Sequence, residues 1–448
     1  MIHMSLADAA MYAGCTVDSQ LGFTGVTTDS RAVVPGMLFA AMPGAQVDGH
    51  DFIEQAVAAG AVAVLVERPV DCPVPQLRVA NTLYALGELA RAWRQSLAPR
   101  VAAITGSNGK TTTKELLASI LRQSGSVHAT AGNYNNELGL PLTLFGLSES
   151  HQFAVLEMGA GKAGDIRYLA GIAEPEVGLI TNVGPAHLEG FGDEEGVARA
   201  KGELYAALPA SGFAVLNLDE PYLPLWQGLL QCQQVLTFGH SPAADVRMER
   251  AASGPRIHTP AGSFELHLNL PGAHNVQNAL AATAMALALD QSLDDIHAGL
   301  AATRPVAGRL NVQRARGGWL VIDDSYNANP ASLKAALEVL TSEAGEAWLA
   351  LGDMRELGAN SDQLHGTMGA LARSLGVARL LAYGPRSRQS VQAFGAGGEH
   401  FSSREELLEA LRKDLHPGVS LLVKGSRSMG MEEVVAAALE PHAAEETD

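Results

Sequence analysis

The chain has 448 residues, which allows about two to four domains, each large enough for its own hydrophobic core. A hydrophobic content of 47% with 18% charged residues excludes wholesale disorder. The net charge of −17, from 31 Lys and Arg against 48 Asp and Glu, argues against a protein that grips nucleic acid or anionic lipid through a basic face.

Cysteine usage and the apolar segments favour a cytoplasmic protein. Cys15, Cys72 and Cys232 are odd in number and far apart, which argues against a disulfide framework. The N-terminus lacks a basic segment, and Asp8 stands where a signal peptide would be apolar. The alanine-rich stretch 279–289 is too short to span a bilayer and predicts a buried helix instead. We therefore expect a soluble cytoplasmic protein without membrane insertion.

The first eighty residues predict a small α/β domain. Short strands are expected at 22–31 and 37–42, then a helix at 52–59 and a strand at 61–67. The segment 81–308 alternates β-rich and helical runs, which is typical of α/β architecture with a mostly parallel sheet. Its candidate strands are 101–105, 153–158, 177–181 and 213–217.

Each of these central strands ends at or beside Gly, Asn, Thr or Asp, the residues expected at the carboxyl edge of a sheet, where ligands bind. Further on, 264–270 alternates strictly between apolar and polar residues and predicts a half-exposed antiparallel strand. A second α/β series begins after residue 308, with candidate strands at 319–323, 347–351, 379–383 and 420–424. The fold class predicted is therefore α/β, with three domains at 1–80, 81–308 and 309–448.

The strongest motif lies where the strand 101–105 meets a glycine-bearing loop and a helix predicted at 114–123. The loop comprises Thr105, Gly106, Ser107, Asn108, Gly109, Lys110, Thr111 and Thr112. Backbone N–H groups of such a turn and the positive end of the helix dipole converge on one point, which favours phosphate. Lys110 can reach the outer phosphates, and the Thr111 hydroxyl can ligate Mg²⁺. Ile104 stands where the common pattern has its first glycine, so the loop is a variant P-loop; a tight turn with an incidental lysine is the competing interpretation.

Oxygen ligands for Mg²⁺ are expected at the ends of neighbouring strands. Glu157 closes one central strand, and His187 follows the next at the same edge, although a loop histidine alone is more often a surface residue. Lys201 falls among small residues on a helix predicted at 196–208. Mg²⁺ would repel a bare ammonium, so a role for Lys201 there requires its neutralisation or conversion to an anion. A solvated helix lysine is the alternative.

These motifs occur together, and in this order, in one known family: the sequence resembles the Mur ligases of bacterial cell-wall synthesis. The stretches that carry the resemblance are 105–115, 157–159, 181–188, 200–203, 270–279 and 308–309. The resemblance implies a small UDP-binding α/β domain, a central P-loop-type ATPase domain with a mostly parallel sheet, and a Rossmann-like C-terminal domain.

Four further stretches resemble the family members that add D-alanyl-D-alanine to UDP-N-acetylmuramoyl-tripeptide: 133–141, 323–330, 351–358 and 423–427. The D-N-P-R tetrapeptide by which a sister branch recognises a free amino acid is absent. The resemblance implies that ATP converts a peptide carboxylate to an acyl phosphate, which the dipeptide amine then attacks. The implied cofactors are ATP and Mg²⁺ at two sites, and a monomer is expected.

The resemblance also implies residue roles. The catalytic set is Lys110, Lys201, His187 and Arg309. The metal set is Thr111, Glu157, His187 and Lys201, with Lys201 carbamylated so that it offers an anionic oxygen. Beyond the phosphate loop, the ATP set is Arg309, Asn278 at the adenine, Asp324 at the ribose and Asn327 at the base. An isolated Asn278 would equally suit a helix cap.

The implied substrate residues lie in two places. The UDP end would be held by Ser30, Arg31, Asp48 and His50. Without the resemblance, these stretches are typical of an ordinary turn and an N-cap. Asn133, Asn135 and Asn136 would hold the muramoyl-peptide, with an asparagine-rich turn as the alternative. Candidates for D-alanyl-D-alanine are Asp353, Arg355, Glu356, Lys424, Ser426 and Arg427, for which surface salt bridges compete.

Two other functions stay open at this point. One is a different amide ligase of the same superfamily, such as the sister branch that adds a free amino acid or a folylpolyglutamate synthase. The other is a P-loop switch or binding protein that hydrolyses ATP without ligating anything.

Overall fold

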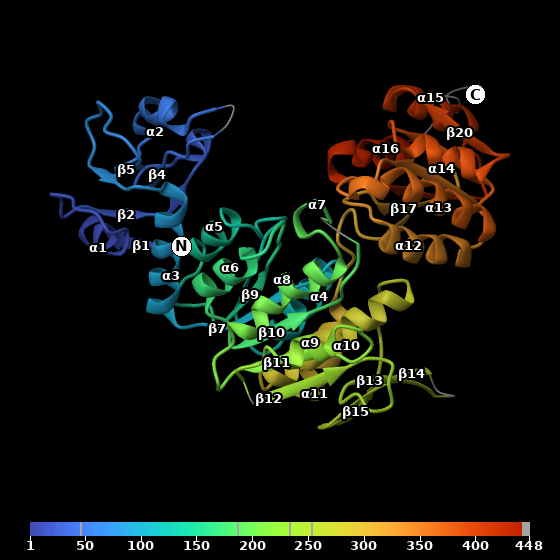
Figure 1. Ribbon diagram of the computed structural model, residues 1–448, viewed down its shortest axis with the longest axis horizontal. Helices are drawn as coiled ribbons and strands as arrows, with labels where there is room; N and C mark the ends of the chain where they lie inside the picture. The colour runs from blue at the N-terminus through green and yellow to red at the C-terminus, as the bar shows by residue number, and fades with distance from the viewer. Residues whose placement is uncertain (45–46, 186–187, 233, 252–253, 441–448) are drawn as a thin grey trace.

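The computed structural model describes residues 1–44, 47–185, 188–232, 234–251 and 254–440. They form three lobes in chain order, each built around its own main sheet (Figure 1). The predicted α/β fold with three domains is confirmed. Residue 80 lies two residues before α3 (Thr82–Leu97), and residue 308 lies between α11 (Leu293–Ala302) and β16 (Asn311–Arg314). The boundaries placed there stay predictions.

The N-terminal lobe, blue in Figure 1, contains two small sheets. Strands β1 (His3–Ser5) and β2 (Gly22–Thr24) pair antiparallel, with α1 (Leu6–Tyr12) between them in the chain. A parallel sheet of order β3-β4-β5-β6 is formed by Val26–Thr27, Leu38–Ala40, Ala63–Val66 and Gln76–Arg78. The short helices of this lobe are η1 (Ser30–Ala32), η2 (Gly49–Phe52) and α2 (Ile53–Ala58).

The prediction of one strand over 22–31 is wrong. Gly25 has a φ of +89°, a conformation that favours glycine, and it separates β2 from β3, which belong to different sheets. The extended backbone then gives way to η1, because the Asp29 side chain caps this helix by accepting from Arg31 N. The elements predicted at 37–42, 52–59 and 61–67 are confirmed with shorter bounds.

Helix α3 (Thr82–Leu97) joins the first lobe to the second. Its buried face, including Leu86, Leu89 and Trp93, belongs to one hydrophobic cluster with Leu65 of the N-terminal sheet and Leu156 of the central sheet. Burial of apolar surface on both sides therefore fixes this helix between the two sheets.

The central lobe contains a six-stranded, wholly parallel sheet of order β12-β11-β10-β7-β9-β8. In that order the strands are Gln234–Phe238, Phe213–Asn217, Val177–Ile180, Arg100–Thr105, Phe153–Glu157 and Val127–Ala129. Its helices are α4 (Lys110–Leu121), α5 (Gly139–Phe145), α6 (Asp165–Ala173), α7 (Leu188–Phe191), α8 (Glu194–Ala206), α9 (Leu223–Gln227), α10 (Ala273–Ala288) and α11 (Leu293–Ala302). All four predicted strands are confirmed. Helix α4 starts four residues before the predicted position, since Gly109 serves as its N-cap and the threonine run lies inside its first turn.

A small antiparallel sheet, β13 (Arg247–Ala251), β14 (Gly254–Thr259) and β15 (Gly262–Glu265), lies beside the central lobe. The strand predicted at 264–270 is wrong in extent, because β15 ends at Glu265. Leu266 still donates its N–H to Pro255 O at 2.8 Å, but Leu266 and Leu270 then pack into the central core without sheet pairing. Alternation alone could not separate a strand from such an irregular segment. The buried helix predicted at 279–289 is confirmed within α10.

The C-terminal lobe has a six-stranded sheet of order β16-β17-β21-β18-β19-β20, in which only β16 is antiparallel. The strands are Asn311–Arg314, Leu320–Asp324, Val419–Lys424, Glu346–Gly352, Arg379–Tyr383 and Gly398–Phe401. Its helices are α12 (Pro330–Ser342), η3 (Gly358–Asn360), α13 (Ser361–Ser374), α14 (Ser387–Phe394), α15 (Arg404–Asp414), η4 (Arg427–Met429) and α16 (Met431–Leu439). The four predicted strands are confirmed to within one or two residues. Because the last strand β21 inserts between β17 and β18, loops distant in sequence meet at one edge.

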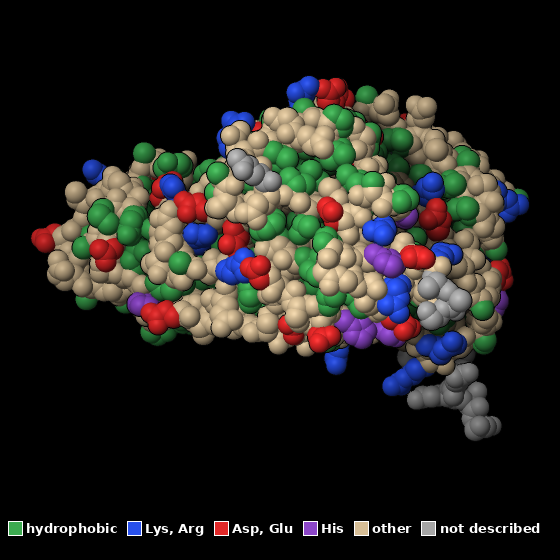
Figure 2. Space-filling model, turned by 90° about the horizontal axis from the view of Figure 1, so that it is seen from below, with side chains coloured by type: hydrophobic (Ala, Val, Ile, Leu, Met, Phe, Trp, Pro, Cys, Tyr) green, Lys and Arg blue, Asp and Glu red, His purple; other side chains and the backbone are tan. Residues whose placement is uncertain are grey.

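Two surface properties bear on function. Among the described residues, no helix is both long and apolar enough to cross a bilayer. On the face shown in Figure 2, acidic and basic side chains are interspersed.

Candidate active site

A cavity of about 690 Å³ lies at the carboxyl edge of the central sheet and reaches the C-terminal lobe. The central lobe supplies the phosphate loop, the ends of β9, β10 and β11, and the start of α10. The C-terminal lobe supplies Arg309, Asp324, Tyr326 and Lys424. Both lobes are therefore needed to enclose whatever binds there.

The phosphate loop is held in shape by the segment that follows β10. Gly106 has a φ of +149°, and a Cβ at this position would lie 1.8 Å from Thr181 Oγ1, so the approach requires glycine. Asn182 brackets Asn108: its Oδ1 accepts from Asn108 N at 2.9 Å and its Nδ2 donates to Asn108 O at 3.1 Å. Helix α4 has no side-chain cap at Gly109, which leaves the N–H groups of its first turn to an anion.

Lys110 folds back over this loop, where its Nζ donates to Gly106 O at 2.8 Å and to Ser107 O at 3.4 Å. Burial lowers the pKa of Lys110, an effect that Glu157 opposes and Arg309 adds to. The two carbonyl oxygens are neutral acceptors. A phosphate oxygen in their place would give the Lys110 ammonium an anionic partner.

Thr111 lies at the centre of a chain of polar contacts. Its Oγ1 donates to Glu157 Oε2 at 2.8 Å and accepts from Arg309 Nη2 at 3.2 Å. The other carboxylate oxygen of Glu157, a side chain only 3% exposed, accepts from Asn135 Nδ2 at 2.7 Å. A hydroxyl and a carboxylate in contact are the hard oxygen donors that suit Mg²⁺, so these two residues fit that ion.

Lys201 lies on α8 and is 3% exposed. Burial, reinforced by the positive charge of Lys110, moves the pKa of Lys201 well below its ordinary value. Two amines beside each other do not suit a site for a metal cation. An anion derived from Lys201 would suit such a site. The solvated-lysine interpretation is wrong.

The other predicted metal ligand, His187, lies outside the described residues. Within the described parts of the chain, no three His, Cys, Asp or Glu side chains are arranged to hold a metal ion.

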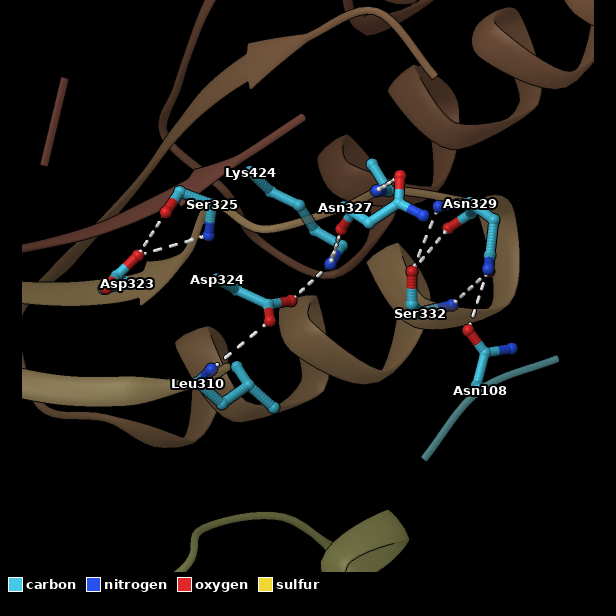
Figure 3. A network of polar contacts seen from close by, with 10 residues as sticks. Asn108, Leu310, Asp323, Asp324, Ser325, Asn327, Asn329, Ser332 and Lys424 are labelled. Atoms are coloured by element: carbon cyan, nitrogen blue, oxygen red, sulfur yellow. Dashed lines mark hydrogen bonds and ion pairs between the residues drawn. The ribbon is translucent and has the colours of Figure 1, made fainter. Parts of the chain in front are cut away.

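The C-terminal wall of the cavity is a polar network, shown in Figure 3. Asp324 forms an ion pair with Lys424 and accepts from Leu310 N at 3.2 Å, while Lys424 also donates to Asn327 O at 2.8 Å. Burial lowers the pKa of Lys424, although the Asp324 carboxylate opposes that shift. One direct contact links this network to the phosphate loop, from Asn329 Nδ2 to Asn108 Oδ1 at 2.7 Å.

Arg309 is placed by stacking as well as by its bond to Thr111. Its guanidinium lies 4.1 Å from the ring centroid of Tyr326, and that of Arg427 lies 5.6 Å from the same ring. Cation–π contacts of this kind orient an arginine without neutralising it. The Tyr326 ring therefore orients the Arg309 guanidinium toward the phosphate loop without supplying a counter-charge.

Asn278 lies inside α10, so the helix-cap alternative is wrong. Its Oδ1 accepts from Thr113 Oγ1 at 3.3 Å, and its Nδ2 donates to Asn275 Oδ1 at 3.0 Å. A Cβ on Gly109 would lie 2.4 Å from the Asn278 Oδ1, so helix and phosphate loop are in close contact there.

The predicted substrate residues divide into two groups. Asn133, Asn135 and Asn136 line the cavity. The N-terminal residues do not: Ser30 bonds Gln55, Arg31 pairs with Asp29, and Asp48 contacts both His50 and Arg68. Among the candidates for D-alanyl-D-alanine, Lys424 lines the cavity, whereas Asp353, Arg355, Glu356, Ser426 and Arg427 do not.

Several cavity residues have no counterpart in the predicted set. Thr181, Asn182 and Glu220 line the cavity, and Glu220 accepts from Val183 N at 3.1 Å. Burial, reinforced by nearby carboxylates, raises the pKa of Glu220 to about 7. Thr181 and Asn182 end a predicted strand at the ligand edge, which was a usable signal; Glu220, three residues beyond a strand, gave none.

Models of known families match most of the chain in three segments. A Mur ligase family catalytic domain matches residues 22–94, the Mur ligase middle domain matches 104–286, and the Mur ligase glutamate ligase domain matches 308–427.

Individual relatives are similar over nearly their full length. The UDP-N-acetylmuramoyl-tripeptide–D-alanyl-D-alanine ligase of Escherichia coli is 43% identical over 420 residues, covering 92% of this chain and 93% of that protein. The crystal structure of MurF from Acinetobacter baumannii superposes with a TM-score of 0.89 at 36% identity, over 97% of this chain and 98% of that one. MurF ligase from Thermotoga maritima in complex with ADP gives 0.83 at 29% identity, over 92% and 96%.

Proposed function

The chain belongs to the Mur ligase family, and from this premise we propose that it joins D-alanyl-D-alanine to UDP-N-acetylmuramoyl-tripeptide at the expense of ATP. The product is the UDP-linked pentapeptide precursor of peptidoglycan, with ADP and phosphate. Relatives of this activity cover nine-tenths or more of the chain at 36–43% identity. A folylpolyglutamate synthase or a simple ATP-driven switch is not favoured by those similarities.

The observation that carries the proposal is the convergence of Lys110, Thr111 and Arg309. They come from two lobes, yet Arg309 Nη2 lies 3.2 Å from Thr111 Oγ1. The terminal phosphate of ATP would lie against all three, with two positive groups on its oxygens. Such preorganised charge stabilises the transferring phosphoryl group.

In the proposed reaction, the tripeptide carboxylate attacks the γ-phosphorus and ADP leaves, giving an acyl phosphate. The amine of D-alanyl-D-alanine then attacks the acyl carbon, and phosphate leaves. No protein nucleophile is needed. The residues of this chain position two anions beside each other and neutralise the charge that develops.

We propose that Thr111 and Glu157 hold Mg²⁺, with His187 and Lys201 completing two sites. When bound, Mg²⁺ would screen the phosphate and carboxylate charges from each other. Lys201 fits this role as a carbamate. Its lowered pKa favours the neutral amine, which is the form that reacts with CO₂. Carbamylation replaces a repelled cation by an anionic oxygen donor.

The remaining substrate groups are assigned by the same proposal. Asn278 and Asn327 would contact the adenine and Asp324 the ribose. Asn133, Asn135 and Asn136 would contact the muramoyl-peptide, and the N-terminal lobe would bind the UDP end. We expect the protein to act in the cytoplasm as a monomer.

Phosphate release tests the proposal directly. We expect release only when ATP, UDP-N-acetylmuramoyl-tripeptide and D-alanyl-D-alanine are all present, with the pentapeptide product detected by mass. Equal release without either acceptor substrate would favour the switch. Activity with a free amino acid in place of the dipeptide would favour a sister ligase.

A further inference from the structure

Lys114 is a buried cation that the proposed reaction does not use. It lies on α4, one turn after Lys110, and is only 2% exposed. Its Nζ donates to Thr130 O at 2.5 Å and pairs with Glu115 Oε1 at 2.7 Å. Burying an ammonium costs free energy unless hydrogen bonds and an ion pair replace its lost hydration. Both partners of Lys114 must therefore stay in place in the folded protein.

Thr130 connects Lys114 to the end of the strand that carries Glu157. It follows the edge strand β8 and is buried, with all three of its polar groups bonded. Its N–H donates to Val155 O at 3.0 Å, its hydroxyl accepts from Glu157 N at 3.0 Å, and its carbonyl accepts from Lys114. One residue therefore links the phosphate-loop helix to the backbone of Glu157.

The segment that begins immediately after Thr130 is exposed and contains Asn133, Asn135 and Asn136. It returns to the same strand end through Asn135, whose Nδ2 bonds Glu157 Oε1 at 2.7 Å and whose carbonyl accepts from Gly159 N at 2.8 Å. Lys114 thus fixes the first end of an exposed segment that bonds Glu157 again through Asn135, while Tyr134 and Asn136 contact α5.

We propose that Lys114 is a positioning residue that holds the 131–138 segment in its substrate-binding conformation by fixing Thr130 against α4 and Glu157. This inference rests on the proposed assignment of Asn133, Asn135 and Asn136 to the muramoyl-peptide. Lys114 does not line the cavity; it ties the nucleotide-binding helix to the segment that would receive the peptide substrate.

Lys114→Met tests the proposal because it keeps the length of the side chain and removes the charge. We expect the KM for UDP-N-acetylmuramoyl-tripeptide to rise about tenfold, while the KM for ATP stays within about twofold. Amide hydrogen exchange in 131–138 should speed up in the ligand-free protein, a readout independent of activity. Lys413→Met, at an exposed position on α15, is the matched control and should change neither.

Thr130 provides a second, independent variant pair. Thr130→Val removes the hydroxyl and should reproduce the KM effect, whereas Thr130→Ser keeps it and should restore ordinary values. The double variant Lys114→Met/Thr130→Val should be less impaired than two independent effects predict, because both act on one anchor.

Two results would overturn the inference while leaving the proposed function intact. One is a folded Lys114→Met protein with wild-type KM values and wild-type exchange in 131–138. The other, decisive if Lys114→Met does not fold, is a Thr130→Val protein indistinguishable from Thr130→Ser. Absence of coupled ligation in the wild-type protein would instead contradict the proposed function.

Discussion

The N-terminal lobe and the central cavity both contain groups of charged side chains, but the partners of these side chains differ. In the N-terminal lobe, Arg31 pairs with Asp29 two residues away and its side chain is 82% exposed. Asp48 likewise contacts His50 and Arg68 within the lobe. These pairs are complete within the lobe. His50 is buried, but Arg31 and Arg68 are exposed, and solvated arginine–carboxylate pairs contribute little to stability.

In the cavity, the side chains of Lys110 and Lys201 lie close together, and burial lowers the pKa of both amines. Arg309 approaches them from another lobe and is held by the Tyr326 ring instead of by a carboxylate. Basic side chains gathered in one cavity favour an anionic ligand, whereas a set of complete local pairs requires none. The cavity is therefore the region where substitutions should affect chemistry most.

The largest expected effect is at Lys201. We expect Lys201→Ala to lower kcat about a thousandfold, because the site loses the anionic oxygen that a carbamate supplies. Formate or acetate at high concentration should restore part of the activity by filling the vacated space with a carboxylate. Lys413→Ala is the control. Unchanged activity in Lys201→Ala, or no response to carboxylates, would contradict the carbamate.

The second effect is at Arg309. Arg309→Lys keeps the charge but loses the planar fork that reaches Thr111 while stacking on Tyr326. We expect kcat to fall about a hundredfold, with a small change in the KM for the UDP substrate. Steady-state kinetics with each substrate varied would measure this, and Arg412→Lys on exposed α15 should be neutral. A rise in KM for the UDP substrate without loss of kcat would place Arg309 outside the phosphoryl-transfer step.

The sequence predicted those parts of the site that follow one strand or one loop. Thr111 and Glu157 could be placed together because carboxyl ends of parallel strands share an edge, and their side chains are 2.8 Å apart. The fold class and eight main parallel strands were predicted for the same reason, since buried apolar runs between turn residues carry a strong signal.

Contacts set by strand order or by side-chain direction could not be predicted in the same way. Lys114 has the pattern of an ordinary solvated helix lysine; its burial depends on edge strand β8, which is only three residues long. Glu220 has significance only because the turn after β11 meets the segment after β10. Such pairings are tertiary, and no local pattern encodes them.

A smaller effect is expected in the N-terminal lobe, where it tests whether an already paired arginine can also bind a ligand. If Arg31 holds the diphosphate, the ligand must compete with Asp29 for an already paired guanidinium. Arg31→Ala should then raise the KM for the UDP substrate about fivefold and leave the KM for ATP unchanged. Arg199→Ala, which removes an exposed pair with Glu195, is the control. No change in either KM would show that the local pairs of this lobe are only structural.

The smallest effect is on the pH dependence of stability, through Glu220. Burial, reinforced by Asp219 and Glu194 and opposed by Val183 N–H, raises the pKa of Glu220 to about 7 from an ordinary value of 4.5. Between these values the folded protein holds a proton that the unfolded chain has lost, so this residue makes stability fall as pH rises from about 4.5 to about 7.

Glu220→Gln keeps an acceptor for Val183 N–H but cannot ionise. Relative to the wild type, we expect its free energy of unfolding to increase by about 1 kcal/mol more at pH 8 than at pH 5, after allowance for partial solvent screening. Urea unfolding at both pH values measures this difference, with Glu409→Gln at an exposed position as the control. A difference that is constant or that shrinks at pH 8 would mean that Glu220 is ionised at little cost, as the N-terminal carboxylates are. The contrast between solvated and buried charge would then not extend to this wall of the cavity.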